Sequence, residues 1–298
     1  MSDDVRLGLI VGGIAAIAIG WTTYKRMDTI RRREQAVTGA IVGVISVGIA
    51  AVLLLFRDGR PDLFAKHFLN FDVLGPYFPG DFVRAMKNTV ILAFVGEFGG
   101  IAIGLILAIM ALSKRRAARA PARVYINFFR GTPLIWQLAF FFFLLLFGFE
   151  LKLGAFTVAM IVFALNTGAY AAEVFRAGIQ SIERGQIEAA RSLGMSYFQS
   201  MRYAIVPQAI RRVIPPLMNE FVILIKDTAL VIVLGLIVGK EDELFTWARA
   251  GVSDTFNATF YTATALGYLA ITLPLIRLVN GVEKRLRSGL VSIAGAAQ

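Results

Sequence analysis

Long apolar segments alternate with short polar ones along most of this 298-residue chain. A helix that crosses the hydrocarbon core of a bilayer needs about 20 predominantly apolar residues, and seven segments approach or exceed that length. They are residues 7–23, 36–56, 82–112, 134–149, 154–175, 213–238 and 258–278. The pattern therefore predicts an all-α, polytopic membrane protein with seven spans.

The polar segments between these spans fall into two classes by charge. Lysine and arginine dominate residues 24–34, 113–123, 176–212 and 283–288. The segments that alternate with them are mixed or acidic, namely residues 57–81, 150–152 and 240–254. Because lysine and arginine mark cytoplasmic loops, seven spans place the N-terminus outside and the C-terminus in the cytoplasm.

The first apolar segment, residues 7–23, is short for a span, and a signal peptide is the alternative interpretation. The preceding residues, MSDDVR, carry two acids, and no small-residue cleavage site follows the apolar run. A strongly basic segment follows instead. Removing this span would also break the alternation of basic and acidic segments, so we interpret it as membrane-spanning.

Glycines recur at every fourth position of the third span, at Gly96, Gly100 and Gly104. Residues with that spacing lie on one face of a helix, and small residues there let two helices approach closely. General glycine enrichment of membrane helices is the alternative explanation. We favour a helix-packing face.

Composition agrees with a membrane protein and removes several other classes. Hydrophobic residues make up 57% of the chain and charged residues 17%, against about 25% charged in a soluble domain. The net charge of +11 would suggest nucleic acid in a soluble protein, but here the basic residues cluster between spans and set topology. With no cysteine and one histidine, His67, disulfides and a Cys/His metal site are excluded.

Catalytic motifs are absent as well. The string nearest to a phosphate-binding loop, GLIVGKE at residues 235–241, is one residue too short and lacks the terminal hydroxyl residue. No nucleophile elbow or zinc-protease helix is present. We therefore predict no catalytic residue, no metal ligand and no enzymatic activity on this chain.

The most distinctive polar stretch is EAARSLGMSYFQSMRYAIVPQA at residues 188–209. Residues 188–190 begin a helical turn, Gly194 would relax or end it, and helix-like polarity then resumes. Ala190 and Leu193 share one helical face. The pattern predicts a helix–bend–helix on the cytoplasmic surface whose small residues suit a groove on another protein. An amphipathic interfacial helix without a partner is the alternative.

EAARSLG, followed by nine residues and AIVP, resembles the signature loop of bacterial ABC importer permeases. Val206 stands where that loop usually has leucine. The resemblance implies that this element couples the membrane domain to an ATPase subunit, through Glu188, Ala189, Ala190, Leu193 and Gly194. It also implies that ATP and magnesium are bound by that separate chain, and that no cofactor is bound by this one.

Four further stretches resemble the polar amino acid subfamily of these permeases. They are NFFRGTPLIWQL (127–138), YAAEVFRAGIQSIERGQIEAARSLG (170–194), VPQAIRRVIPP (206–216) and IKDTAL (225–230), in which Ala229 replaces the usual serine. The resemblance implies three regions. They are an N-terminal two-span extension with an external loop at 1–79, a five-span transmembrane domain at 80–285 with a coupling loop at 176–212, and a cytoplasmic tail at 286–298.

The resemblance also implies an assembly in the bacterial cell membrane. Two permease subunits, identical or similar, would pair around a central pathway, with two ATPase subunits below and an extracytoplasmic amino-acid-binding protein above. The stretch Arg130–Pro133 would mark the cytoplasmic start of the fourth span.

Polar residues inside the spans are the candidates for the substrate pathway, because such residues are costly and tend to be functional. They are Glu97, Gln137, Asn166, Thr167, Asn219 and Lys226. Lys226 could bind a substrate carboxylate and Glu97 an ammonium group, which favours glutamate or glutamine. Alternatively, Glu97 pairs with a neighbouring helix, and Lys226 with Asp227 holds a break between helix segments.

Two other functions fit an all-α membrane protein. One is an ion-coupled secondary transporter, which often contains inverted repeats, and the other is a scaffold that transports nothing. No convincing internal repeat is found, and the loop at 188–209 has no role in either. An ABC importer for another substrate class is disfavoured by the four subfamily stretches.

Overall fold

The computed structural model describes residues 44, 48, 61–182, 184–236 and 240–295. The two N-terminal spans predicted at 7–23 and 36–56 lie outside the described residues. All regular secondary structure among the described residues is helical, and these residues contain no strand. The prediction of an all-α chain is therefore confirmed for the described residues. The described residues belong to two units, which divide between Asn70 and Phe71. The described helix of the first unit is α3 (Pro61–Phe68).

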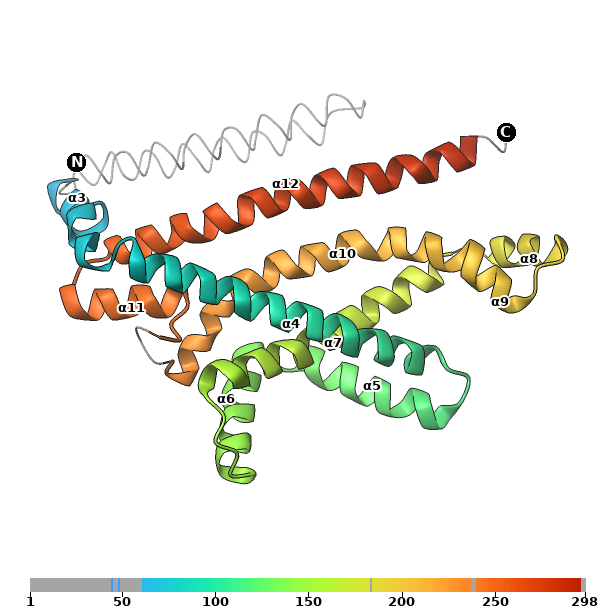
Figure 1. Cartoon of the computed structure of the whole chain (residues 1–298), viewed down its shortest axis with the longest axis horizontal. Helices are drawn as coiled ribbons and strands as arrows, with labels where there is room; N and C mark the ends of the chain where they lie inside the picture. The colour runs from blue at the N-terminus through green and yellow to red at the C-terminus, as the bar shows by residue number, and fades with distance from the viewer. Residues whose placement is uncertain (1–43, 45–47, 49–60, 183, 237–239, 296–298) are drawn as a thin grey trace, which may run out of the picture. The chain divides into compact units, whose positions relative to one another are not determined.

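Three helices of the second unit are long and apolar enough to cross a membrane. They are α4 (Gly80–Leu112), α7 (Ala155–Gln180) and α12 (Thr259–Gly295). A fourth crossing arises if α5 (Arg116–Gly131) and α6 (Leu134–Phe143), with its π-helical continuation η2 (Leu144–Gly148), are one span bent by 109° (Figure 1). The described residues therefore contain three or four of the predicted spans by these criteria.

The predicted span at 213–238 has a different form. Helix α10 (Val206–Asp227) gives way to a 3-10 helix, η4 (Thr228–Leu234), which ends at Gly235 in a left-handed conformation with a φ of 63°. Helix α10 is long enough to cross a membrane, but its charged residues exclude it from the apolar group. The charges on α10 therefore need protein or water around them.

The core is centred on the contact between α4 and α7. A methyl group added to Gly96 would lie 2.6 Å from Phe163 Cβ, and one added to Gly104 would lie 2.6 Å from Ala171 Cβ. Between them, a methyl group on Gly100 would meet Thr167 at 2.5 Å. These are the glycines of the predicted packing face, and their lack of a side chain lets Phe163, Thr167 and Ala171 of α7 pack directly against α4.

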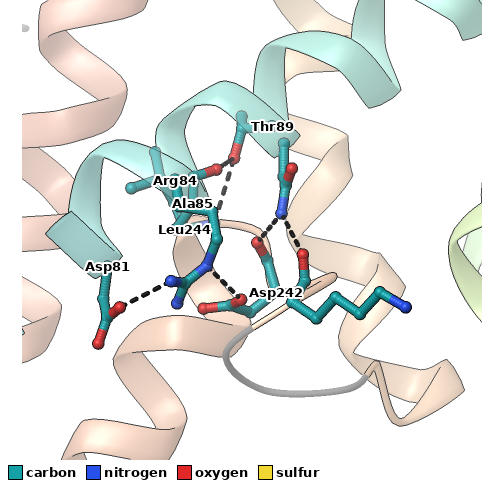
Figure 2. Close-up of polar contacts among 8 residues, drawn as sticks. Asp81, Arg84, Ala85, Thr89, Asp242 and Leu244 are labelled. Atoms are coloured by element: carbon teal, nitrogen blue, oxygen red, sulfur yellow. Dashed lines mark hydrogen bonds and ion pairs between the residues drawn. The ribbon is translucent and has the colours of Figure 1, made fainter.

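Polar contacts fasten the first turns of α4 to the segment that precedes α11 (Leu244–Thr255) (Figure 2). Arg84 pairs with Asp81 at 2.7 Å and with the buried Asp242 at 3.5 Å. Asn88 donates hydrogen bonds to the carbonyl oxygens of Lys240 (3.2 Å) and Asp242 (2.9 Å). These contacts hold two segments that are far apart in the sequence at one end of the bundle.

Glu243 is the N-cap of α11 and is fully buried. Its carboxylate accepts hydrogen bonds from the backbone N–H groups of Phe245 and Thr246, both at 2.7 Å. It also accepts bonds from the Thr246 hydroxyl at 2.8 Å and from the Tyr268 hydroxyl of α12 at 3.1 Å. Four donors thus surround one carboxylate and tie α11 to α12.

Candidate functional site

The predicted helix–bend–helix is present at the end of α7 and α10 that lies away from α11 (Figure 1). Helix α8 (Arg184–Ser192) ends in a bend at Gly194, whose φ is 82°. Gly194 N–H donates to the Arg191 carbonyl at 3.0 Å, and Met195 N–H donates to the Ala190 carbonyl at 3.2 Å. This is a Schellman motif, which explains the glycine, because side chains disfavour the left-handed conformation that the motif requires.

A second local device starts the next helix. Ser196 accepts a hydrogen bond from the Gln199 N–H at 3.2 Å, and Gln199 accepts one from the Ser196 N–H at 2.8 Å. This capping box begins α9 (Tyr197–Gln199), which continues as the π-helix η3 (Ser200–Ile205) into α10. The bend between α8 and α9 is therefore specified on one side by backbone hydrogen bonds and on the other by side chains that accept from the backbone.

The bend presents large apolar side chains to solvent. We call them the coupling surface; they are Leu193, Tyr197, Phe198 and Tyr203, exposed by 81%, 64%, 71% and 65%. Of the other predicted residues, Glu188 and Ala189 are exposed, whereas Ala190 is only 5% exposed and packs within its own chain. Exposed apolar groups of this size, gathered on one polar element, are typical of a protein or membrane contact.

The base of this element is bound to both neighbouring helices. The Arg212 guanidinium on α10 donates to the Ser181 hydroxyl at 2.9 Å and to the Ser181 carbonyl at the end of α7. One turn earlier on α7, Gly178 lies directly against the Val213 side chain. A displacement of the bend therefore acts on α7 and α10 together.

The side chains of two predicted pathway residues, Gln137 and Asn166, form hydrogen bonds within the chain. Gln137 donates to the carbonyl oxygens of Phe129 (2.8 Å) and Thr132 (3.0 Å) and to the Thr132 hydroxyl (2.8 Å). Asn166 on α7 donates to the Gln137 side-chain oxygen at 2.9 Å. Both amides are buried and brace the bend between α5 and α6 against α7.

The remaining predicted pathway residues occupy different environments. Thr167 is buried in the contact between α4 and α7. Glu97 is 3% exposed, and neither of its carboxylate oxygens has a hydrogen-bond partner among the described residues. Asn219 and Lys226 on α10 are exposed. The structure therefore joins Gln137 to Asn166 and leaves the other four apart from that network.

An ion-paired group that the sequence did not indicate lies at the end of α5. Arg176 binds the Glu173 carboxylate at 2.6 Å, and Arg130 approaches the same carboxylate at 3.7 Å. The Arg130 guanidinium also lies over the Tyr170 ring, 5.6 Å from its centre, and interacts electrostatically with Glu220 of α10. Spacing alone could have suggested the Glu173–Arg176 pair on one helix, but Arg130 joins it only through the fold.

The position of Arg130 corrects one expectation. The sequence placed residues 130–133 at the cytoplasmic start of a span, but the Phe129 carbonyl accepts a hydrogen bond from Asn166, in the middle of α7, at 3.5 Å. The break between α5 and α6 is therefore level with the middle of α7. In the part of the chain that is described, no group of three or more histidine, aspartate or glutamate residues could hold a metal ion.

Comparisons with known proteins agree with this geometry. Residues 100–288 match the family described as "Binding-protein-dependent transport system inner membrane component". The chain is 39% identical over 207 residues to a probable amino-acid ABC transporter permease protein, YckA, of Bacillus subtilis (strain 168), covering 68% of this chain and 88% of that protein. It is 36% identical to the glutamine transport system permease protein GlnP of Escherichia coli (strain K12), covering 69% and 92%.

A solved structure gives the same result. A crystal structure of an amino acid ABC transporter with histidines contains a chain that is 36% identical to this one. The two superpose with a TM-score of 0.64, and the alignment covers 73% of this chain and 98% of the other.

Proposed function

Because this chain belongs to the family of binding-protein-dependent transport system inner membrane components, we propose that it moves polar amino acids, above all glutamate or glutamine, as the permease subunit of an ATP-driven importer. The matches to amino-acid ABC transporter permeases confirm the resemblance drawn from the sequence motifs. They also confirm a multi-pass protein of the bacterial plasma membrane. The choice of glutamate or glutamine rests on the named glutamine relative and on the positive charge of Lys226.

The coupling surface is the proposed contact with an ATPase subunit. Its apolar side chains face away from the rest of the chain, and the Schellman motif and the capping box hold the bend in one conformation. Glu188, Ala189 and Gly194 belong to this contact, with Gly194 acting through backbone shape because no atom lies within 4 Å of a methyl group built on it. Ala190 supports the element from inside. ATP and magnesium belong to the ATPase chain.

Transmission of force follows from the packing at the base of the bend. Arg212 and Gly178 link it to α10 and α7, and the glycine face of α4 makes α4 and α7 one rigid pair. A tilt of the bend then moves a group of helices rather than a loop. Inward-open and outward-open states are different packings of these groups, which nucleotide and the loaded binding protein favour to different degrees.

The assembly that this requires has four kinds of component. A second permease subunit, identical or similar, completes the pathway, two ATPase subunits bind the cytoplasmic side, and an extracytoplasmic amino-acid-binding protein delivers the substrate. Lys226 near the outer end of α10 is the proposed contact for the substrate carboxylate. Contact between Glu97 and the substrate ammonium group requires α4 and α10 to separate, because Glu97 is buried here.

The exposed coupling surface on a rigid, helix-anchored bend is the observation that carries this proposal. The test is to purify the chain from cells that co-express a candidate ATPase subunit and a candidate amino-acid-binding protein from the same organism, and to reconstitute the complex in lipid nanodiscs. We expect the ATPase to co-purify and glutamine- or glutamate-loaded binding protein to stimulate ATP hydrolysis. Uptake that proceeds without ATP and follows an ion gradient would instead establish the secondary transporter, and the proposal would be wrong.

A further inference from the structure

The break between α5 and α6 lies at the depth of the hydrocarbon core. The Tyr125 hydroxyl of α5 donates to the Leu165 carbonyl at 2.8 Å, and Asn166 binds the Phe129 carbonyl. At 1.5 Å per residue, Asn166 lies about 16 Å from the start of α7, which is roughly half of the ~30 Å hydrocarbon thickness. Residues 131–133, which separate the two helices, are therefore near the middle of the bilayer.

Two independent features at this depth are incompatible with lipid contact. The first is backbone, because Gly131 and Pro133, on either side of the helix break, are exposed, and irregular backbone is not tolerated against hydrocarbon. The second is charge, because the Arg130 side chain is 44% exposed at the same place, and charged groups at membrane depth face water or protein. This surface of the chain therefore faces the interior of the assembly.

The chemistry of the surface favours anions. We define the arginine row as Arg130, Tyr170, Glu173, Arg176 and Gln180. The row itself holds two arginines and one glutamate. Arg123 adds a positive charge that acts on Glu173, and Glu220 adds a negative charge near Arg130. The row runs from the middle of α7 toward its cytoplasmic end and keeps an excess of positive charge.

Within the row, the two pairing arginines are held differently. Arg176 contacts the Glu173 carboxylate through two nitrogens, at 2.6 and 3.2 Å, and donates to Gln180 at 2.6 Å. Arg130 has the longer 3.7 Å ion pair and the greater exposure. Arg130 is therefore the guanidinium that can exchange Glu173 for another carboxylate, and a guanidinium binds a carboxylate in a planar, two-bond geometry.

We propose that the arginine row lines a water-filled inner half of the translocation path, and that Arg130 binds the carboxylate of the amino acid as it moves toward the cytoplasm. The second part rests on the proposed function. Lys226, near the outer end of α10, and Arg130, level with the middle of α7, then act on the same carboxylate in succession. Arg176 is a positioning residue that keeps Glu173 from closing on Arg130.

Water access can be measured directly, because the chain has no native cysteine. Tyr170→Cys and Ala177→Cys, on the exposed side of α7, are treated in the assembled complex with anionic and cationic methanethiosulfonate reagents. Ile109→Cys is the matched control, because Ile109 is 62% exposed on the apolar surface of α4. We expect both α7 positions to react at least tenfold faster than the control, and faster with the anionic reagent. When Arg130→Gln is added to each α7 cysteine variant, the preference for the anionic reagent should decrease.

Labelling at positions 170 and 177 that is no faster than at position 109 would mean that lipid or the second permease covers this surface, and the aqueous path would be wrong. A reaction rate that does not depend on reagent charge would remove the anion preference.

Transport tests the role of Arg130. In proteoliposomes with the complete complex, we expect Arg130→Gln to raise the KM for glutamate or glutamine uptake about tenfold and Arg130→Lys to raise it less. Arg116→Gln, at the exposed cytoplasmic start of the same helix, should change nothing. If the Arg130→Gln complex assembles in lower yield but has a normal KM, Arg130 only stabilises the structure and the proposal is wrong. If the wild-type complex transports no amino acid while the α7 cysteines react as expected, the proposed function fails and the aqueous path stands.

Discussion

Arg212 in the first half of α10 binds both the hydroxyl and the carbonyl of Ser181 at the end of α7. Helices α7 and α10 are thereby joined at the point where the segment between them, residues 181–205, leaves and rejoins the bundle. The joint lies between the coupling surface and the rest of the helices, so under the proposed coupling it is one of the links that carry force, beside the continuous run from α9 to α10 and the contact of Gly178 with Val213.

Removing the contact between Arg212 and Ser181 should uncouple amino acid uptake from ATP hydrolysis in the complex. For Arg212→Ala we expect uptake per ATP hydrolysed to fall about fivefold, since a hydrogen bond from a charged group contributes roughly 1.5–3 kcal/mol, and exposure reduces that value here. Arg211→Ala, the exposed neighbour, is the control. Parallel measurement of uptake and ATP hydrolysis checks this, and equal behaviour of the two variants would contradict it.

The bend at Gly194 should depend on glycine for its backbone conformation alone. Gly194→Ala places a side chain at a φ of 82°, which costs about 1–2 kcal/mol, although nothing lies within 4 Å. Gly185→Ala, inside α8 and equally unobstructed, should be neutral or favour the helix. Crosslinking of Tyr197→Cys to the ATPase should fall in the first variant and persist in the second. A Gly194→Ala protein that couples normally would show that the bend is not specified in this way.

The glycine contact between α4 and α7 should be intolerant of one added carbon. Gly100→Ala puts a methyl group 2.5 Å from Thr167, and overpacking of this kind typically costs about 1–3 kcal/mol. We expect a lower melting temperature of the complex in detergent, partly restored by adding Thr167→Gly. Gly281→Ala, where no atom lies within 4 Å, should melt as the wild type does. An unchanged melting temperature for Gly100→Ala would mean that the helices can separate without cost.

The N-cap of α11 should require both oxygens of Glu243. Glu243→Gln replaces one acceptor with an amide N–H₂ that would face donors, and a buried unsatisfied group costs about 1–3 kcal/mol. The expected result is a lower melting temperature and faster proteolysis within α11, with Glu241→Gln as the control. Equal proteolysis of the two variants would contradict the role of the cap.

The sequence predicted the long elements well because their signal is local. The apolar segments 82–112, 154–175 and 258–278 correspond to α4, α7 and α12. The bend after Ala190 was also predictable, because glycine is the residue that a helix uses to end in a left-handed conformation.

The course of the chain from the end of α4 to the start of α7 was not predictable in the same way. Residues 116–123, interpreted as part of a loop, form the start of α5, and the chain then turns by 109° after Gly131. That turn is held by Gln137 and Asn166, which are 29 residues apart. Gln137 and Asn166 stood out in the sequence because polar residues are costly inside a membrane span. Only their hydrogen-bond partners in the structure show that they stabilise the fold.

The glycine face of α4 has a consequence for where a solute can cross. Each glycine of this face lies directly against a side chain of α7, namely Phe163, Thr167 or Ala171. Separating the two helices would remove these contacts from every fourth residue of α4 at once. On the proposed function, the substrate path therefore runs beside the contact between α4 and α7. Its moving walls would be the helices that pack against these two, α5, α6 and α10.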